Sequence, residues 1–294
     1  MPVEYLRNPV LYMGGIQDVA LPDAVHRQGS LRRLGGAAAV QRHRGSPADP
    51  WGWPALYYAD YRLNGGVKVH TRNQYTCCSG TYIQNIADFH NQIYYKDDSN
   101  LYVSLYVPSE LAWKRADGQV KVIQDTKYPE EETSRLRLTM NNSSRFGLNL
   151  RIPEWSRGVT IKVNGVAAQA PIQGGTWAKL DRTWNSEDTV EIQIPLPLRY
   201  QAVDAQHPRR MAIVRGPVAM VMDGLVHEPV YKLPDNQEEL NKLMVPDQEP
   251  AVFRYVPRDG TNVMSRLRPF YSIGPDYYYR MYLDLDQLPI VLWS

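Results

Sequence analysis

The chain has 294 residues, of which 43% are hydrophobic, and it carries 33 Lys and Arg against 31 Asp and Glu. Its apolar fraction is that of a folded globular protein, and its length suggests about two domains. A formal net charge of +2 gives no electrostatic case for nucleic acid or an anionic membrane as a partner. No apolar run approaches the roughly 20 residues of a membrane-spanning helix, and the two cysteines cannot build a disulfide framework.

Tyr and Trp dominate the aromatic residues, with 20 Tyr and seven Trp beside four Phe. Both side chains join a flat apolar face to a polar edge, which suits stacking on sugars. They are also frequent in β-strands, so composition leaves both a carbohydrate-binding surface and ordinary strand packing open. The candidates for sugar stacking are Trp113, Trp155, Trp177 and Trp184.

Residues 1–54 differ in composition from the rest of the chain and are predicted to be irregular. The first lysine is Lys68, and the segment from Leu21 to Pro54 is rich in Arg, Gly, Ala, His and Pro. It has no helical or alternating apolar period. Three interpretations stay open: a flexible linker, a processed leader, or sequence read out of frame. The start lacks the basic and then apolar pattern of a secretory signal, and both a cytoplasmic and a periplasmic location stay open.

From residue 55 the expected elements follow in order. The segment ALYYADYRLNGGVKVHT predicts a hairpin that turns at Asn64-Gly65. In TYIQNIADFHNQIYY, apolar side chains recur at helical spacing and predict a helix over residues 82–94. Thr81, with Gln84 three residues later, fits a capping box at the start of that helix.

After residue 100 the apolar pattern changes to the alternation of strands. The segments LYVSLYV, KVIQ, RLRLTM and GLNLRI alternate, TIKVNGV carries an Asn-Gly turn, and TVEIQIPLPL is the cleanest strand. Short strands with regular turns predict a β-sandwich over residues 96–199.

A second β domain, itself incomplete, is expected over residues 200–294. RRMAIVRGPVAMVMDG predicts two short strands that break at Gly216-Pro217, and VFRYVP and YYYRMYLDLDQ predict further strands. LPDNQEELNKLMVPDQEP predicts a short helix on a polar loop. No repeat of fixed period is visible, which argues against a solenoid or a propeller.

The chemical feature of the chain is an adjacent pair of cysteines, Cys77 and Cys78, just before the predicted helix. Adjacent cysteines do not readily form an unstrained disulfide with each other, and the dipole of a following helix favours the thiolate. The pair is therefore a candidate metal or nucleophile site, or else two small buried apolar residues. Two thiolates do not complete a zinc site, which normally has four ligands. The nearest imidazoles are His70 and His90, and the helical spacing of His90 favours packing or solvent exposure over metal ligation.

Several segments together resemble glycoside hydrolase family 127, the β-L-arabinofuranosidase-like group. They are YYADY, NQYTCCSGT, NLYVSLYVPSELAW, LNLRIPEWS, VTIKVNG and MAIVRGPVAMV, and the resemblance covers about residues 55–221. It implies an N-terminal (α/α)₆ barrel that holds the active site, followed by β-sandwich domains. It also implies a zinc ion held by a Glu and three cysteines. Cys77 would then be both the nucleophile and a zinc ligand, and Cys78 a zinc ligand, in a retaining mechanism on a carbohydrate substrate.

The first part of the chain departs from this family pattern. The sequence has no third cysteine, and the only Glu before Glu110 is Glu4. The resemblance therefore implies a mainly β chain of two β-sandwich-type domains. They are preceded over residues 55–95 by the end of such a barrel, which contains its last helix and the Cys-Cys site. The chain alone is expected to be inactive and not to hold zinc stably, because the acid/base Glu and two zinc ligands are missing. The alternatives are a non-catalytic carbohydrate-binding β-sandwich protein and a redox or metal-storage protein.

Overall fold

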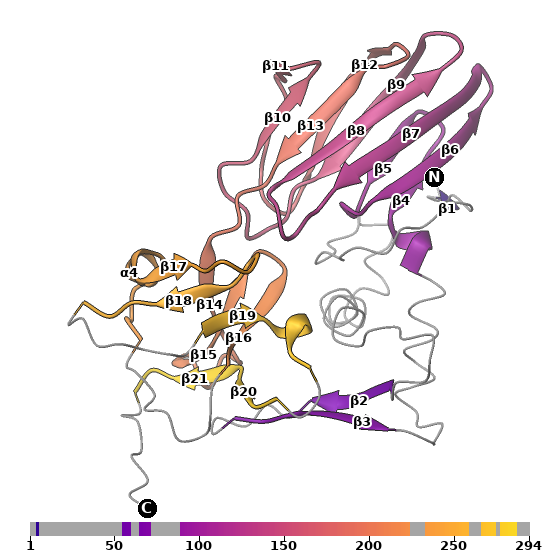
Figure 1. Cartoon of the computed structure of the whole chain (residues 1–294). Coiled ribbons are helices and arrows are strands. Elements are labelled where there is room, and N and C mark those ends of the chain that lie inside the picture. The colour runs from indigo at the N-terminus through magenta and orange to yellow at the C-terminus, as the bar shows by residue number, and fades with distance from the viewer. Residues whose placement is uncertain are drawn as a thin grey trace, which may run out of the picture. The chain divides into compact units, whose positions relative to one another are not determined.

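A computed structural model describes residues 4–5, 55–59, 65–71, 89–223, 233–258, 266–274 and 277–286 (Figure 1). These residues belong to two compact units, and the chain passes from the first to the second between Leu196 and Pro197. Nearly all of the atypical segment 1–54 lies outside the described residues. In the described part of the chain, no helix has the length and apolar character needed to span a membrane.

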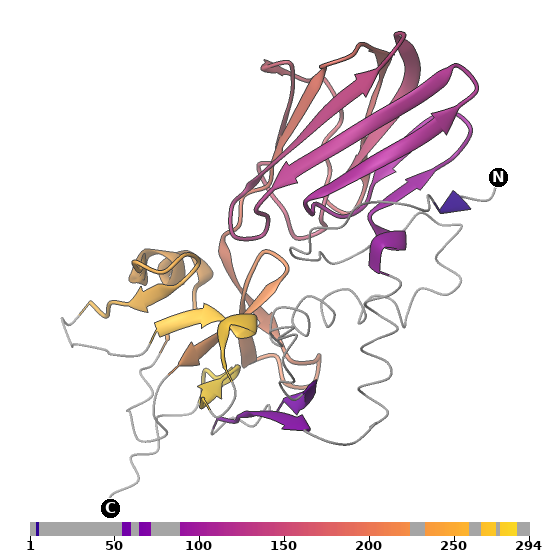
Figure 2. The same ribbon diagram turned by 45° about the vertical axis from the view of Figure 1, so that its right-hand side comes forward.

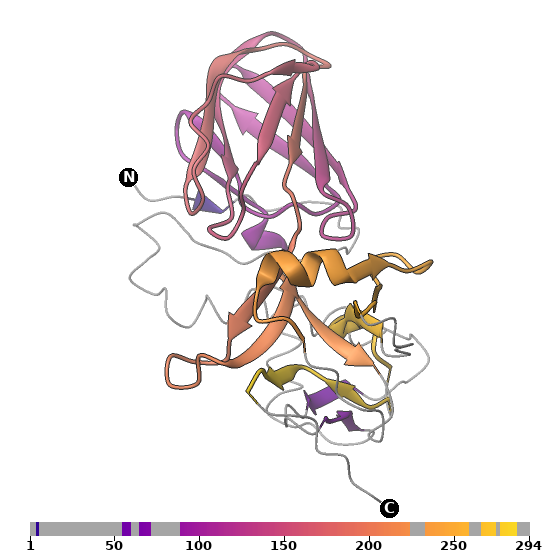
Figure 3. The same cartoon turned by 90° about the vertical axis from the view of Figure 1, so that its left-hand side faces the viewer.

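The first unit is a β-sandwich, and Figures 2 and 3 show its two layers from other sides. One sheet has five strands in the order β1-β4-β5-β9-β12, and the other has six in the order β11-β10-β13-β8-β7-β6. The strands of the first sheet are β1 (Glu4–Tyr5), β4 (Tyr94–Lys96), β5 (Asn100–Val103), β9 (Ser144–Arg151) and β12 (Trp177–Trp184). Those of the second are β6 (Ser109–Arg115), β7 (Gly118–Thr126), β8 (Thr133–Met140), β10 (Thr160–Val163), β11 (Val166–Ala167) and β13 (Thr189–Gln193). The six-stranded sheet is antiparallel throughout, whereas β5 and β9 run parallel.

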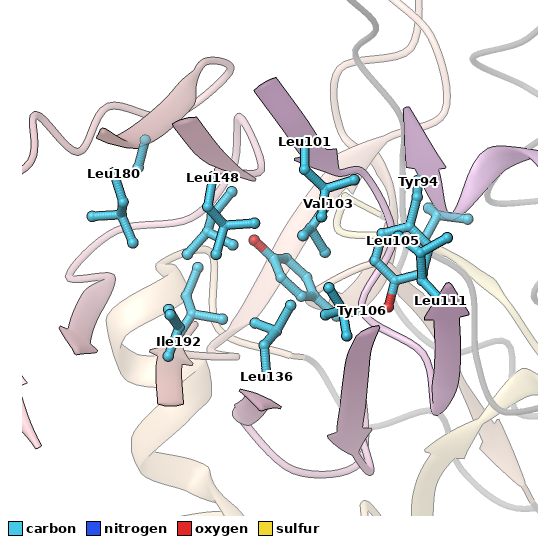
Figure 4. Close-up of a cluster of buried hydrophobic side chains, with 14 of the residues drawn as sticks. Tyr94, Leu101, Val103, Leu105, Tyr106, Leu111, Leu136, Leu148, Leu180 and Ile192 are labelled. Atoms are coloured by element: carbon cyan, nitrogen blue, oxygen red, sulfur yellow. The ribbon is translucent and has the colours of Figure 1, made fainter. Parts of the chain in front are cut away.

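The core of the sandwich consists of alternate side chains from both sheets, as the period of the strands predicts. Leu101 and Leu148 come from the five-stranded sheet, and Leu136 and Ile192 come from the six-stranded sheet. The ring of Tyr106 lies between these two groups in Figure 4, and all five side chains have no exposed surface. The predicted β-sandwich and the mainly β fold class are therefore confirmed.

Two predicted elements in this unit end earlier than expected. The helix predicted over residues 82–94 ends in a short 3₁₀ helix, η1 (His90–Gln92), and Tyr94 already belongs to β4. The segment LYVSLYV is a strand only as far as Val103, because the chain then crosses to the other sheet. Leu105, Tyr106 and Val107 stay fully buried in this crossing without pairing as a strand, so the strand prediction was wrong for them.

The second unit is built on an eight-stranded sheet with the order β14-β15-β16-β19-β18-β17, where β20 pairs with β16 and β21 pairs with β15. Its strands are β14 (Leu198–Ala202), β15 (Arg210–Arg215), β16 (Val218–Asp223), β17 (Met244–Pro246), β18 (Phe253–Tyr255), β19 (Arg266–Pro269), β20 (Tyr279–Arg280) and β21 (Tyr282–Asp284). The 3₁₀ helix η2 (Phe270–Ser272) follows β19. The predicted short helix is α4 (Gln237–Leu243), where the side chain of Asn236 accepts a hydrogen bond from the Glu238 N–H as N-cap.

Two predicted hairpins are confirmed. β2 (Ala55–Ala59) pairs antiparallel with β3 (Lys68–Thr71), although Asn64 in its turn lies outside the described residues. Strands β10 and β11 are joined by Asn164 and Gly165, which have φ values of 51° and 81°. Both values lie in the left-handed region that a two-residue hairpin turn requires, which explains the Asn-Gly pair.

Candidate functional site

The predicted catalytic and metal site lies outside the described residues. Both Cys77 and Cys78 fall in the interval 72–88, together with the first part of the predicted helix. Of the two nearby imidazoles, His90 is half-buried in η1, and His70 lies on β3. Among the residues that are described, no group of three or more His, Cys, Asp or Glu lies close enough to hold a metal ion.

The structure does describe how the segment after the cysteines is held. The side chains of Phe89 and Ile93 are 4% and 0% exposed and belong to the core of the sandwich. The carbonyl of Ile93 accepts hydrogen bonds from the N–H groups of Ser104 and Leu105, at 2.9 and 3.3 Å. The end of the predicted helix is therefore fixed to the crossing between the two sheets. Part of the apolar face of this helix end, at Phe89 and Ile93, packs on the sandwich.

A buried polar cluster lies next to this helix end. The hydroxyls of Tyr94 and Ser109 share a hydrogen bond of 2.9 Å, and Gln124 Nε2 donates to both hydroxyls at 3.3 Å and to the Leu105 carbonyl at 3.1 Å. Burial raises the pKa of Tyr94, and its hydrogen bonds with Ser109 and Gln124 oppose this shift. Tyr94 is thus a neutral phenol that joins β4 to β6 and β7, and it is unsuited to act as a base.

Asp97 closes the turn between β4 and β5. Its carboxylate accepts hydrogen bonds of 2.8 Å from the Ser99 N–H, the Asn100 N–H and the Tyr102 hydroxyl. Burial raises the pKa of Asp97, but the hydrogen bonds together outweigh burial, and the pKa lies below its usual value. This carboxylate shapes a turn, and its partners leave it little capacity for acid/base work.

The four tryptophans that were candidates for sugar stacking are buried or half-buried. Trp113 and Trp184 are 2% and 0% exposed, and Trp184 Nε1 donates to the Phe146 carbonyl at 3.1 Å. Trp155 packs against the same core, and Trp177 meets the ring of Tyr102 edge-on at 5.2 Å. Strand packing therefore accounts for Trp113 and Trp184. A different surface of the first unit, which was not predicted from the sequence, is hollowed.

That surface is a cavity of about 880 Å³ on the first unit, lined by residues of β6, β7, β8, β10 and β13 together with Pro108 and Gly165. All five strands belong to the six-stranded sheet. The exposed and half-buried side chains among them alternate with buried ones along each strand, so they point away from the sandwich core. The other strand residues at the cavity, Ser109, Gln124, Leu136 and Val190, are buried. The outward-pointing set consists of charged and polar side chains and one apolar side chain: Glu110, Asp125, Arg135, Arg137, Lys162, Thr189 and Glu191, together with Ile123.

Comparison with protein families gives a match over the sandwich. Residues 100–196 match the family described as beta-L-arabinofuranosidase, GH127 middle domain. This confirms the resemblance to glycoside hydrolase family 127 that the sequence segments indicated. A search of curated proteins gave no match.

Solved structures with a similar fold include enzymes of the same family. A GH127 β-L-arabinofuranosidase from Geobacillus stearothermophilus T6 is 22% identical, with a TM-score of 0.53, and the alignment covers 71% of this chain and 37% of that one. The GH127 β-arabinofuranosidase BT3674 is 20% identical, with a TM-score of 0.61 and coverages of 87% and 45%. A structure described as a glycoside hydrolase is 18% identical, with a TM-score of 0.60 and coverages of 82% and 43%. These matches show a shared fold, and the chain spans less than half the length of each of these structures.

Proposed function

We propose that this chain contributes a cysteine pair and two β domains to a zinc-dependent retaining glycoside hydrolase that resembles the β-L-arabinofuranosidases. In this proposal Cys77 is the nucleophile and a zinc ligand, and Cys78 is a zinc ligand. The observation that supports it is the order of segments along the chain. NQYTCCSGT stands directly before the helix whose end is fixed to the GH127 middle domain.

The two thiolates fit the proposed metal, because zinc prefers soft sulfur ligands. When bound, zinc keeps such ligands deprotonated at neutral pH. The Cys77 thiolate would attack the anomeric carbon of the sugar, forming a carbon–sulfur bond as the glycosidic carbon–oxygen bond breaks. The leaving oxygen takes a proton from a Glu, and water then releases the sugar with retained configuration. No residue of this sequence matches that Glu or the remaining zinc ligands of the family pattern.

The role of the sandwich in this proposal is to hold the end of the helix after the nucleophile. Ile93 is completely buried, and its carbonyl is bonded to the crossing between the sheets. Reactive groups need to be held to within about 0.5 Å of the productive geometry, which requires a rigid support. A helix end that belongs to a close-packed core supplies such a support.

The proposal is tested by a chimera in which residues 73–294 replace the matching part of an intact GH127 enzyme. The chimera is expected to hydrolyse an aryl β-L-arabinofuranoside and to hold zinc, as measured by mass spectrometry. Cys77→Ser should lower turnover by at least about a thousandfold, because it removes the nucleophile, and Cys78→Ser should also lower the zinc content. A matched control is Ser143→Ala, which changes an exposed serine in the turn between β8 and β9 and leaves both cysteines. Turnover that survives Cys77→Ser in a folded chimera would refute the proposed nucleophile.

The isolated chain gives a second, independent measurement. It is expected to show no turnover of the same substrate, because the acid/base Glu has no match in the sequence. Turnover by the isolated chain at the level of an intact family enzyme would contradict the expectation that groups from outside this sequence are needed.

A further inference from the structure

The cavity on the six-stranded sheet has no part in the chemistry proposed above. Its volume of about 880 Å³ lies within the roughly 300–1,000 Å³ that small-molecule sites occupy. The side chains that line it come from five neighbouring strands and follow the register of the sheet. Eight of the lining residues form two rows that cross the strands, and the rows differ in chemistry.

The first row is a line of alternating charges. Asp125, Arg135, Glu191 and Lys162 lie on β7, β8, β13 and β10, and each is in register with the next. Arg135 Nε lies 2.9 Å from a Glu191 carboxylate oxygen, and Lys162 Nζ lies 3.7 Å from the other. Two negative and two positive groups therefore give this row no net charge, with donors and acceptors in alternation.

The second row places an apolar side chain between polar ones. Glu110, Ile123, Arg137 and Thr189 lie in register on β6, β7, β8 and β13. Ile123 is half-buried, although it points to the outer face of the sheet. Arg137 is 53% exposed and has a long ion pair of 3.5 Å with Glu187, so its guanidinium has donors to spare for a ligand.

We propose that this cavity binds a neutral oligosaccharide. The two rows together carry three positive and three negative groups, so the cavity does not select a charged ligand by its net charge. Alternating donors and acceptors match a ligand that has many hydroxyl groups, each of which both donates and accepts. Ile123 offers an apolar contact for the C–H face of a sugar ring. The lining contains no aromatic side chain among the described residues, so recognition rests on hydrogen bonds.

Affinity electrophoresis of the full-length chain tests this proposal in native gels that contain neutral linear arabinan, anionic polygalacturonate or no polysaccharide. The chain is expected to be retarded in the arabinan gel relative to the gel without polysaccharide. Arg137→Ala is expected to raise the Kd for arabinan about tenfold, the loss typical of a charge-assisted hydrogen bond. Ile123→Asp, at a partly exposed position, should also weaken retardation.

The matched control is Arg145→Ala on β9 of the opposite sheet. Arg145 is 73% exposed and has a long ion pair of 3.6 Å with Asp181, so the change removes the same charge from a comparable setting. Its retardation should equal that of the unchanged chain. Thermal unfolding of each variant confirms that it is folded.

Three results would overturn the proposal: no retardation in arabinan, equal retardation of the Arg137→Ala and unchanged chains, or retardation in polygalacturonate alone. Failure of the proposed enzymatic function would appear in the turnover and zinc content of the chimera, because binding to the cavity requires neither cysteine. Absence of turnover in the chimera together with retardation of the chain in arabinan would count against the enzymatic function and support the site on this sheet.

Discussion

Lys68 on β3 is a buried cation whose folded-state pKa has a measurable consequence. Its side chain is 2% exposed, and Nζ donates to the carbonyls of Phe270 and Ile273 at 2.7 and 2.6 Å. The ammonium also lies 4.4 Å from the centre of the Phe270 ring. Burial lowers its pKa from 10.5 to about 8. The second unit therefore contains a lysine that gives up its proton more readily when folded than when unfolded.

The sign of the effect on stability follows from proton counting. Between about pH 8 and 10.5 the unfolded chain keeps the Lys68 proton that the folded unit has lost, so the free energy of unfolding rises with pH in that window. For pKa values of 10.5 and about 8, the rise between pH 7.5 and pH 9.5 is about 2 kcal/mol. Below the window both states hold the proton, and the contribution no longer changes.

Urea unfolding followed by circular dichroism at pH 7.5 and pH 9.5 measures this rise. Lys68→Met should remove this rise. The difference in unfolding free energy between the variant and the unchanged chain should therefore change by about 2 kcal/mol between pH 7.5 and pH 9.5. Lys242→Met is the matched control, because Lys242 is a lysine of the same unit that is 65% exposed and pairs with Glu238. Equal pH dependence of the unchanged chain and Lys68→Met would refute the assignment of a lowered pKa to Lys68.

Three further predictions concern the segment that joins the helix end to the sandwich. Ile93→Ala should lower the unfolding free energy by about 2–4 kcal/mol, because it opens a cavity at a fully buried site. In the same urea titration, Val166→Ala at a 71% exposed site should change the unfolding free energy by less than about 0.5 kcal/mol. Tyr94→Phe should cost about 1–2 kcal/mol, because Gln124 and Ser109 lose a buried partner, and an unchanged urea midpoint would contradict this role. Asp97→Ala should cost about 1 kcal/mol at pH 7 and less as the pH falls through the lowered Asp97 pKa. Asp98→Ala, at an exposed site, should change the unfolding free energy at pH 7 by less than about 0.5 kcal/mol.

Alternation along the chain predicted the sandwich because the register of each strand is visible in its own sequence. In TVEIQIPLPL, the residues expected on one face, Val190, Ile192 and Ile194, are all completely buried. The Asn-Gly turn after β10 was visible for a similar reason, since only a few residue types tolerate a positive φ. Such features are local, and a single sequence is enough to find them.

Features that depend on contacts between distant segments were missed. Leu105, Tyr106 and Val107 alternate like a strand, but they cross between the sheets, where their burial comes from both layers. The cavity was also missed, because it needs Glu110 and Glu191 on one face of one sheet. Alternation shows that each of these residues faces away from the core, but it does not show which strands lie side by side.

The junction between the helix end and the sandwich connects the packing of the fold to the proposed chemistry. The carbonyl of Ile93 is bonded to Ser104 and Leu105, the residues that begin the crossing between the sheets. The next residue in that crossing, Tyr106, lies between the two layers and donates to the Arg151 carbonyl at 2.8 Å. The packing of Tyr106 is therefore linked to the end of the predicted helix by the backbone of Leu105 and the hydrogen bonds of the Ile93 carbonyl. If the proposed function holds, the sandwich is part of what positions the nucleophile, although none of its side chains acts on the substrate.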